Sequence, residues 1–179
     1  GVEDSIFLKN LKIKGKIPEN VNIEELVIKK NDELLKIIEK ERLKISDEII
    51  KILKFLKKRY KIAVASNSEK KFVLKVMEKT KILEYFNIVI TRNDVKIPKP
   101  SPEIYLLTSK KLNIPPENLI AFEDSETGII AAKETGIFCI GLATTQPVEK
   151  LKMADIIINE LNLENVKKVI KTFEGKNEN

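Results

Sequence analysis

The sequence predicts an α/β protein built around a parallel β-sheet, and three observations support this fold class. From about residue 46 onward, short apolar runs alternate with segments of helical period, which is the pattern of βαβ units. The run Ile62–Ala65 is apolar throughout, as expected of a strand that is covered on both faces. Residues that favour helix starts follow several of these runs. We therefore predict a doubly wound domain over residues 46–179, preceded by a polar helical segment over residues 1–45.

Length and composition indicate one globular domain, or one domain with a small accessory part. The 179 residues are 42% hydrophobic and 34% charged, which is typical of soluble globular proteins. No apolar run is long enough to span a membrane, and the acidic segment Gly1–Asp4 does not resemble a secretory signal. A single cysteine, Cys139, excludes a disulfide framework within one chain. We expect a cytoplasmic protein that has no membrane partner.

Charge and histidine content exclude further classes of function. The net charge of +6 comes from lysine-rich helices, and the lysine pairs are scattered along the chain instead of gathering on one element. Basic platforms with aromatic residues are absent from the sequence, so we expect no nucleic-acid partner. The chain contains no histidine, which excludes histidine-based catalysis and most transition-metal sites.

The first strong helical pattern follows Asn22, where apolar residues recur with a 3.6-residue period from Ile23 to Ile38. Lys30 interrupts this apolar face, and Asn31 lies beside it. A lysine at the edge of a packed face can extend its ammonium group into water. Alternatively, Lys30 is a cation directed into a cleft. The sequence leaves both interpretations open.

The second helix is predicted to begin after Ser46, a good N-cap residue, with acidic residues in its first turn that complement the helix dipole. A later helix starts at Ser101 and Pro102, which suit the N-cap and the first helical position. Ser125 caps another helix, which Gly136 ends. A final helix covers residues 163–173. Between these helices we expect short strands at residues 62–65, 88–90, 119–122, 138–142 and 154–158.

Polar side chains follow three of the predicted strands. Ser66 and Asn67 follow the first strand, Lys99 lies between two prolines after the second, and Glu123 and Asp124 end the third. In a parallel sheet these strand ends meet at the edge where α/β proteins bind ligands. Hydroxyl and backbone N–H groups suit an anion, and Mg²⁺ prefers carboxylate and phosphate oxygens. The three strand ends together predict a phosphate site with a Mg²⁺ ion.

Each of these features taken alone has a structural explanation. Serine and asparagine after a strand are common where a helix starts, and a lysine between prolines can simply be exposed. Adjacent acidic residues before an N-cap often only complement a helix dipole. The prediction of a site therefore depends on the three features occurring together and in order.

Three motifs in the sequence resemble those of a known protein family. They are AVASNS, DVKIPKPSPEIY and LIAFEDSETGIIAAKETG. They resemble motifs of the haloacid-dehalogenase-like (HAD) hydrolases, in the variant of the β-phosphoglucomutase-like and phosphoglycolate-phosphatase-like branch. This resemblance implies a Rossmann-like core, and residues 1–45, with KKNDELLKII, resemble part of a helical cap.

The resemblance also implies roles for individual residues. Ser66 would hydrogen-bond the phosphoryl group with Asn67 beside it, and Lys99 would neutralise the charge of the phosphoryl group and of the nucleophile. Asp124 would bind Mg²⁺. Glu123 would either bind the metal directly or contact one of its direct ligands. In the cap, Lys30 and Asn31 match a position that contacts substrate in mutase relatives.

The sequence lacks one part of the family's catalytic pattern. The family uses an aspartate nucleophile in a D-x-D motif after its first strand, and no two of the six aspartates here are separated by one residue. The resemblance places this first strand in the middle of the sheet. We therefore expect either a piece of a phosphatase or a short protein that binds phosphate or a partner without catalysis. Two exposed sheet edges would then favour self-association.

The expected activity is Mg²⁺-dependent hydrolysis of a small phosphorylated metabolite, with this chain inactive alone. A sugar-phosphate mutase is less favoured, because no arginine follows Gly1-Val2 and Glu69 stands where mutase relatives often have lysine. A restored N-terminal segment would leave the mutase possible. The alternative from another class is a non-catalytic module that binds phosphate or a partner.

Overall fold

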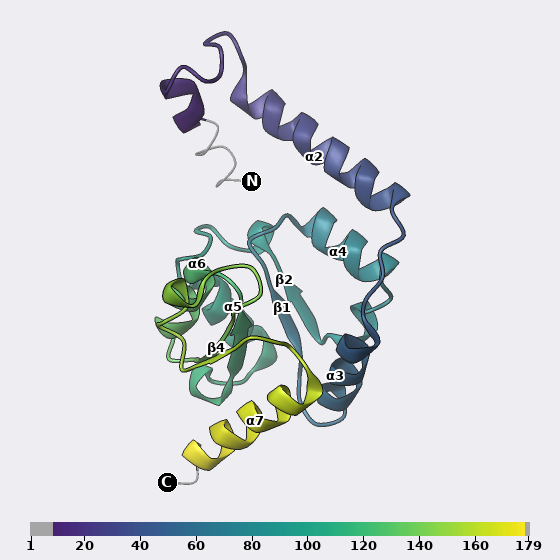
Figure 1. Cartoon of the computed structure of the whole chain (residues 1–179), viewed down its shortest axis with the longest axis vertical. Helices are drawn as coiled ribbons and strands as arrows, with labels where there is room; N and C mark the ends of the chain where they lie inside the picture. Colours follow the sequence, from purple (N-terminus) through teal and green to yellow (C-terminus); the bar gives the residue numbers. More distant parts are fainter. Residues whose placement is uncertain (1–8, 178–179) are drawn as a thin grey trace.

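The computed structural model describes residues 9–177 and has three layers. Helices α5 (Glu103–Leu112) and α6 (Glu126–Lys133) cover one face of the strands. Helices α3 (Asp47–Lys57) and α7 (Leu163–Asn177) pack together on the other face (Figure 1). The arrangement is that of an α/β protein, which confirms the predicted fold class.

All strands that pair among the described residues run parallel, as predicted. Strand β1 (Ala63–Ala65) pairs with β2 (Ile88–Ile90). Strand β4 (Phe138–Leu142) lies between β3 (Ile120–Glu123) and β5 (Ile156–Ile158). The five predicted strands are therefore present, with boundaries that shift by at most two residues.

Two further helices are α2 (Ile23–Lys40) and α4 (Lys70–Lys79). Short 3₁₀ turns cover residues 83–85, 92–94, 116–118 and 148–150. The predicted N-caps are confirmed at two helices. Ser46 Oγ accepts from Ile49 N at 3.3 Å, and Ser125 Oγ accepts from Gly128 N at 3.1 Å.

Three helix boundaries differ from the sequence prediction. Helix α5 begins at Glu103, one residue later than predicted, and Ser101 Oγ accepts from Glu103 N at 3.3 Å. Helix α6 ends at Lys133, and Gly136, with φ of 83°, lies in the turn after it. Helix α7 continues past residue 173 to Asn177, and in this last turn Glu174 accepts from Tyr60 and Lys176 lies over the Phe138 ring. Such shifts of one turn or less are common where tertiary contacts decide helix ends.

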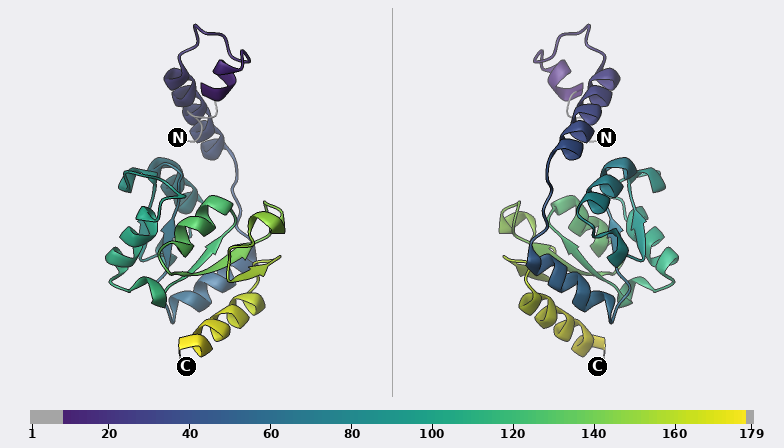
Figure 2. Two further views of the ribbon diagram at one scale, coloured as in Figure 1. Left: turned by 90° about the vertical axis from the view of Figure 1, so that its left-hand side faces the viewer. Right: turned by 90° about the vertical axis from the view of Figure 1, so that its right-hand side faces the viewer.

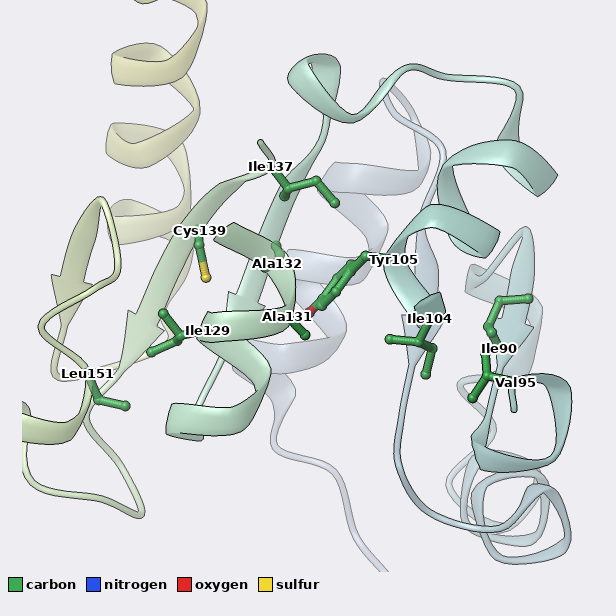
Figure 3. Packing of buried hydrophobic residues seen from close by; sticks show 11 residues of the cluster. Ile90, Val95, Ile104, Tyr105, Ile129, Ala131, Ala132, Ile137, Cys139 and Leu151 are labelled. Carbon is green, nitrogen blue, oxygen red and sulfur yellow. The ribbon is translucent and has the colours of Figure 1, made fainter. Parts of the chain in front are cut away.

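The largest buried cluster joins α5 and α6 to the strands beneath them (Figure 3). Ile104 of α5 and Ile129 of α6 are almost completely buried, and Ile137 before β4 packs with them. Cys139 has no exposed surface, and burial, with the nearby Glu123 charge, raises the pKa of its thiol to about 12. Cys139 therefore acts as a small buried residue, as the sequence analysis expected.

The strands form two separate groups, with β1 and β2 in one and β3, β4 and β5 in the other. Strand β4 has a neighbour on each side and is buried over four of its five residues. In contrast, all of β1 and alternate residues of β3 are only half-buried. Among residues 9–177, β1 and β3 therefore each have one edge without a strand partner.

Helix α2 lies apart from the layered core and is joined to α3 by residues 41–46 (Figure 2). Lys79 of α4 donates to the carbonyls of Ile38 and Glu41 at 2.6 and 2.8 Å, which holds the end of α2 against α4. The predicted boundary between residues 45 and 46 falls within the connecting segment, and the division into two domains stays a prediction. The Gly1–Asp4 segment, used above to argue against a secretory signal and a mutase, lies outside the described residues.

Within residues 9–177, no helix is both long and apolar enough to cross a membrane. Several large apolar side chains are exposed. Three of them, Ile28, Leu34 and Ile37, lie on α2, and Leu106 lies on α5.

We expect Asp155→Asn to weaken the protein more at neutral pH than in acid. Asp155 Oδ2 accepts from Lys133 Nζ at 2.7 Å and from Cys139 N at 2.8 Å. Burial opposes ionisation, but these two hydrogen bonds hold the pKa of Asp155 below its usual value of 3.8. A lowered folded-state pKa stabilises the protein above the unfolded pKa, and this stabilisation is lost as the pH falls from about 5 towards 3.

Urea unfolding at pH 7 and pH 3 measures this effect. The substitution should lower the free energy of unfolding by about 1.5–3 kcal/mol at pH 7, the usual range for hydrogen bonds to a charged group. At pH 3 the difference between variant and parent should shrink. An equal difference at both pH values would contradict the assigned role.

Candidate active site

The carboxyl ends of β1 and β3 meet at Lys99. Lys99 Nζ donates to the carbonyl of Ala65, the last residue of β1, at 2.9 Å. The same ammonium group forms a hydrogen-bonded ion pair with Glu123 Oε1 at the end of β3. Lys99 and Glu123 are 7% and 6% exposed. The structure therefore brings the predicted lysine to the edge where the predicted carboxylates lie.

The loop that carries Lys99 is attached to the end of β1 by Asn67. Asn67 Oδ1 accepts from Lys99 N at 2.9 Å, and Asn67 Nδ2 donates to Lys99 O at 3.1 Å. Glu103 at the start of α5 accepts from the backbone N–H groups of Lys96 and Ile97, both at 2.8 Å. The side chains of Asn67 and Glu103 thus hold the backbone of this loop in place, although the loop is not part of a β-sheet.

Ser66 lies directly after β1 and is half-buried. Its backbone N donates to Ile90 O of β2 at 3.0 Å, and its hydroxyl accepts from Ser68 N at 3.1 Å. Helix α4 begins later, at Lys70, with Glu69 in the N-cap position. Ser66 is therefore not the N-cap of α4, so a plain capping role does not explain its place at the strand end.

Glu123 has a second buried partner, Tyr105 of α5, whose hydroxyl donates to the same Oε1 atom. Burial and the Glu123 charge raise the pKa of Tyr105 well above its usual value, so the hydroxyl keeps its proton. The other carboxylate oxygen faces Gly128, where an added Cβ would lie 1.8 Å from Oε2. The Glu123 side chain is thus directed towards Lys99 and Tyr105 and enclosed by α6.

The sequence analysis did not identify Tyr105 as a site residue. Tyr105 is the last residue of the motif DVKIPKPSPEIY, and it is largely buried on α5. Its position three residues after Pro102, in the first turn of the helix, is the sequence signal that could have indicated an inward-facing hydroxyl. That signal is ambiguous, because a tyrosine in a helix usually contributes its apolar ring to the core.

Asp124 lies next to Glu123 but has a different environment. Its side chain is exposed, and Asp124 Oδ2 accepts from Thr145 Oγ1 at 3.1 Å. Thr145 Oγ1 also lies 3.2 Å from the Asp124 carbonyl. Thr145 comes from the loop after β4, and the sequence analysis did not identify it, because nothing local indicates that this loop reaches β3. The structure thus separates the acidic pair into one buried and one exposed carboxylate.

The predicted cap residues Lys30 and Asn31 lie on α2. Asn31 is 5% exposed, and its Nδ2 donates to Glu69 Oε1 at 2.9 Å, which links α2 to the start of α4. Lys30 is exposed. The contact of Lys30 and Asn31 with substrate stays a prediction.

The described residues include no group of three or more histidine, cysteine or acidic side chains able to hold a metal ion. Mg²⁺ does not need such a group, because it retains several waters and is commonly held by one or two carboxylates together with substrate phosphate. The exposed Asp124 carboxylate fits this mode of binding. Glu123 fits it less well, since its oxygens already face Lys99, Tyr105 and Gly128.

Comparison with known sequences supports the same family. Residues 2–142 match the sequence model of haloacid dehalogenase-like hydrolases. Validoxylamine A 7'-phosphate phosphatase of Streptomyces hygroscopicus subsp. limoneus is 44% identical over 79 residues, covering 44% of this chain and 37% of that protein. A phosphorylated carbohydrates phosphatase of Thermotoga maritima is 39% identical over 98 residues, covering 54% of this chain and 45% of that protein. The matched segments thus span less than half the length of these two relatives.

Comparison of folds agrees with the sequence matches. The crystal structure of a β-phosphoglucomutase from Clostridium difficile superposes with a TM-score of 0.78 and 24% sequence identity. The superposition covers 95% of this chain and 78% of that protein. At this identity the likeness shows the fold alone, whereas the family match extends over most of the chain. The chain therefore belongs to the haloacid dehalogenase-like hydrolase family.

Proposed function

We propose that this chain provides the phosphate- and Mg²⁺-binding part of a phosphatase that hydrolyses a small phosphorylated metabolite, with phosphorylated carbohydrates as the favoured class. The observation that carries the proposal is the meeting of Lys99 with the carboxyl ends of β1 and β3, beside Ser66 and Asp124. Membership of a hydrolase family and similarity to two phosphatases of phosphorylated compounds support it.

In this proposal each residue acts on the phosphoryl group through its own chemistry. The Ser66 hydroxyl donates to a phosphoryl oxygen, and the Lys99 ammonium group offsets the negative charge that the phosphoryl group brings. Glu123 and Tyr105 orient Lys99, and the amide of Asn67 holds the Lys99 backbone.

Asp124 would hold Mg²⁺ in this proposal, with Thr145 orienting its carboxylate. Bound Mg²⁺ supplies electrostatic stabilisation of charge on the phosphoryl oxygens. In this proposal the chain presents one exposed carboxylate, that of Asp124, at the carboxyl ends of the strands. The buried ammonium group of Lys99 lies at the same end of the strands. Asp124 and Lys99 thus hold opposite charges at the same edge.

One observation favours a second function, a non-catalytic module that binds phosphate or a partner. The 179 residues contain no D-x-D pair. The phosphate-binding residues do not require such a pair. A sugar-phosphate mutase is the third possibility, if a segment bearing D-x-D accompanies the chain.

Hydrolysis of p-nitrophenyl phosphate in the presence of Mg²⁺ separates these functions. The 179-residue chain should be inactive, and a fusion that adds an N-terminal strand bearing D-x-D should be active. In the fusion, Asp124→Asn should lower kcat/KM by about 100-fold or more, because charge stabilisation by a metal is worth several kcal/mol. Asp47→Asn, at an exposed position in the first turn of α3, is the matched control and should leave the rate unchanged.

The outcomes are distinguishable. A fully folded fusion without activity, together with Mg²⁺-dependent phosphate binding measured by titration calorimetry, would support the non-catalytic module. Turnover by the 179-residue chain alone would contradict the assignment of the nucleophile to a D-x-D segment. Equal activity of the Asp124→Asn fusion and the parent fusion would contradict the metal site.

A further inference from the structure

Helix α2 is held on the core by two sets of polar contacts with α4 (Figure 1). On α2, Asn31 and Ile38 are buried, and they lie seven residues apart, which is about two turns. They are therefore on the same side of α2. Asn31 contacts Glu69 at the start of α4, and the Ile38 carbonyl contacts Lys79 at its end. The two helices thus run side by side in the same direction.

The spacing of these contacts matches on the two helices. Glu69 and Lys79 are ten residues apart. Asn31 and Glu41, the last residue whose carbonyl accepts from Lys79, are also ten residues apart. Because an α-helix rises about 1.5 Å per residue, both pairs span about 15 Å. The contacts at the two ends therefore form together, and α2 cannot slide along α4 without losing both.

Lys79 occupies the carboxyl end of α2. Its Nζ donates to the carbonyls of Ile38, Glu39 and Glu41 at 2.6, 2.5 and 2.8 Å. The last carbonyls of a helix lack partners within the helix, and the helix dipole favours a cation there. An ammonium group has three N–H donors, and these three carbonyls can accept all of them. Lys75 and Glu39 also form an ion pair at 2.9 Å, but their side chains are 36% and 56% exposed, so water weakens this contact.

Glu69 holds the other end of α2. It occupies the N-cap position of α4, but its side chain makes no capping hydrogen bond. Asn93 instead accepts from Lys70 N at 2.8 Å. Glu69 Oε1 accepts from Asn31 Nδ2 at 2.9 Å, and Glu69 Oε2 lies 3.6 Å from Lys71 Nζ. The Glu69 carboxylate therefore serves as a link to α2 and not as a helix cap.

Helix α4 begins close to the strand end that carries Ser66. Ser66 Oγ accepts from Ser68 N at 3.1 Å, and Ser68 O accepts from Arg92 N, in the turn after β2, at 3.2 Å. Glu69 is the next residue, so a short hydrogen-bonded segment fixes it relative to Ser66. Helix α4 thus connects the proposed phosphate-binding serine to both contacts that hold α2.

We propose that Glu69 and Lys79 are positioning residues, which hold α2 at a fixed distance from the site at the carboxyl ends of β1 and β3. Held in this way, α2 selects the part of the substrate beyond the phosphoryl group. Neither side chain contacts the phosphoryl group in this proposal, and both act through α2. Asn31 is then a link to α4 instead of a substrate contact, and its neighbour Lys30 is carried with it. The proposal rests on the phosphate site of the proposed function.

Hydrogen exchange of the 179-residue chain tests whether these residues hold α2. Lys79→Met should speed exchange at least about tenfold in the last turn of α2, because three hydrogen bonds are lost. Glu69→Ala should speed exchange near Asn31. Lys79→Arg, which keeps a donor cation, should stay close to the parent. Lys110→Met, at an exposed position of α5, is the matched control and should leave exchange in α2 unchanged.

Two probes separate the phosphate site from the contribution of α2. Titration calorimetry in the presence of Mg²⁺ measures the affinity of the chain for inorganic phosphate and for glucose 6-phosphate. The parent should bind glucose 6-phosphate more tightly, because α2 adds contacts with its carbohydrate part. Lys79→Met and Glu69→Ala should weaken glucose 6-phosphate binding by about tenfold, the usual effect of losing one hydrogen bond, and change phosphate binding by less than about twofold. Lys79→Arg should restore the preference, whereas a general loss of structure would weaken the binding of both probes.

The outcomes separate this proposal from the proposed function. A parent chain that binds neither probe contradicts the phosphate site and with it the proposed selection, whereas the exchange measurements still show whether Glu69 and Lys79 hold α2. Equal binding of both probes by the parent overturns the proposal, because α2 then selects nothing. Unchanged exchange of α2 in Lys79→Met also overturns it. So does a Lys79→Met variant in which α2 is loosened but the preference for glucose 6-phosphate stays that of the parent.

Discussion

Glu123→Leu is expected to lower the free energy of unfolding by about 3–5 kcal/mol, the usual effect of removing one partner of a buried ion pair. The loss arises because the ammonium group of Lys99 would remain buried without its carboxylate. The Tyr105 hydroxyl would lose its acceptor at the same time. Urea unfolding followed by circular dichroism measures the change.

Removing both charges should cost much less than the sum of the single substitutions. In Lys99→Met/Glu123→Leu neither charge is left buried alone, and apolar replacements of a buried ion pair are often nearly neutral. The double-mutant cycle should therefore give a coupling energy of several kcal/mol between these side chains. Additive losses would contradict a direct ion pair.

An exposed ion pair provides the control for this cycle. Glu164 and Lys168 on α7 lie 2.7 Å apart, with side chains 76% and 69% exposed. Because water screens such pairs, Glu164→Gln should leave the unfolding midpoint unchanged within experimental error. If both substitutions had similar effects, burial would not be the reason for the importance of Glu123.

Gly128→Ala is expected to destabilise the protein by an amount comparable to Glu123→Leu. An added Cβ would lie 1.8 Å from Glu123 Oε2 and 2.2 Å from its carboxyl carbon, which is closer than non-bonded atoms approach. The end of a glutamate side chain is normally free to move away. Here Lys99 and Tyr105 hold it, so relieving the clash breaks their hydrogen bonds.

A second cycle tests whether the clash acts through Glu123. In a Glu123→Ala background, Gly128→Ala should have little effect or be stabilising by up to about 1 kcal/mol, the helix propensity difference between alanine and glycine. Gly175→Ala in α7 is the control, because an added Cβ there meets nothing within 4 Å. A loss from Gly128→Ala that is the same in both backgrounds would contradict this mechanism.

Much of the fold could be predicted from sequence because its signals are local. The caps at Ser46 and Ser125 and the apolar strand segments are properties of a few consecutive residues. Helix ends were less predictable. Helix α7 extends to Asn177, four residues beyond the predicted end, and its last turn contacts Tyr60 and Phe138, which are distant in the sequence.

The candidate site was predictable in part for the same reason. Ser66, Lys99, Glu123 and Asp124 follow apolar strands, and parallel strands bring their ends to one edge, so their proximity could be inferred. Tyr105 and Thr145 could not be identified in this way. Tyr105 reaches Glu123 from a covering helix, and Thr145 reaches Asp124 from the loop after β4.

The different roles of the acidic pair also depended on tertiary structure. Glu123 and Asp124 are neighbours of equal charge in the sequence, but side chains alternate along a strand. Glu123 therefore turns into the core towards Lys99, and Asp124 faces solvent beside Thr145. The sequence analysis expected Asp124 to bind the metal and left open whether Glu123 binds it directly. The partners of Glu123 support its role in orienting Lys99 and leave the exposed Asp124 as the proposed metal ligand.

The sequence by itself determined the family, the alternation of strands and helices, and which polar residues follow the strands. Each of these features depends only on a short contiguous stretch of residues. Only the tertiary structure decided which partners hold Lys99 and how the acidic pair divides its roles. The reason is distance along the chain. Lys99 contacts Ala65 and Glu123, which lie 34 and 24 residues away, and no local pattern in any of these segments reports the contacts.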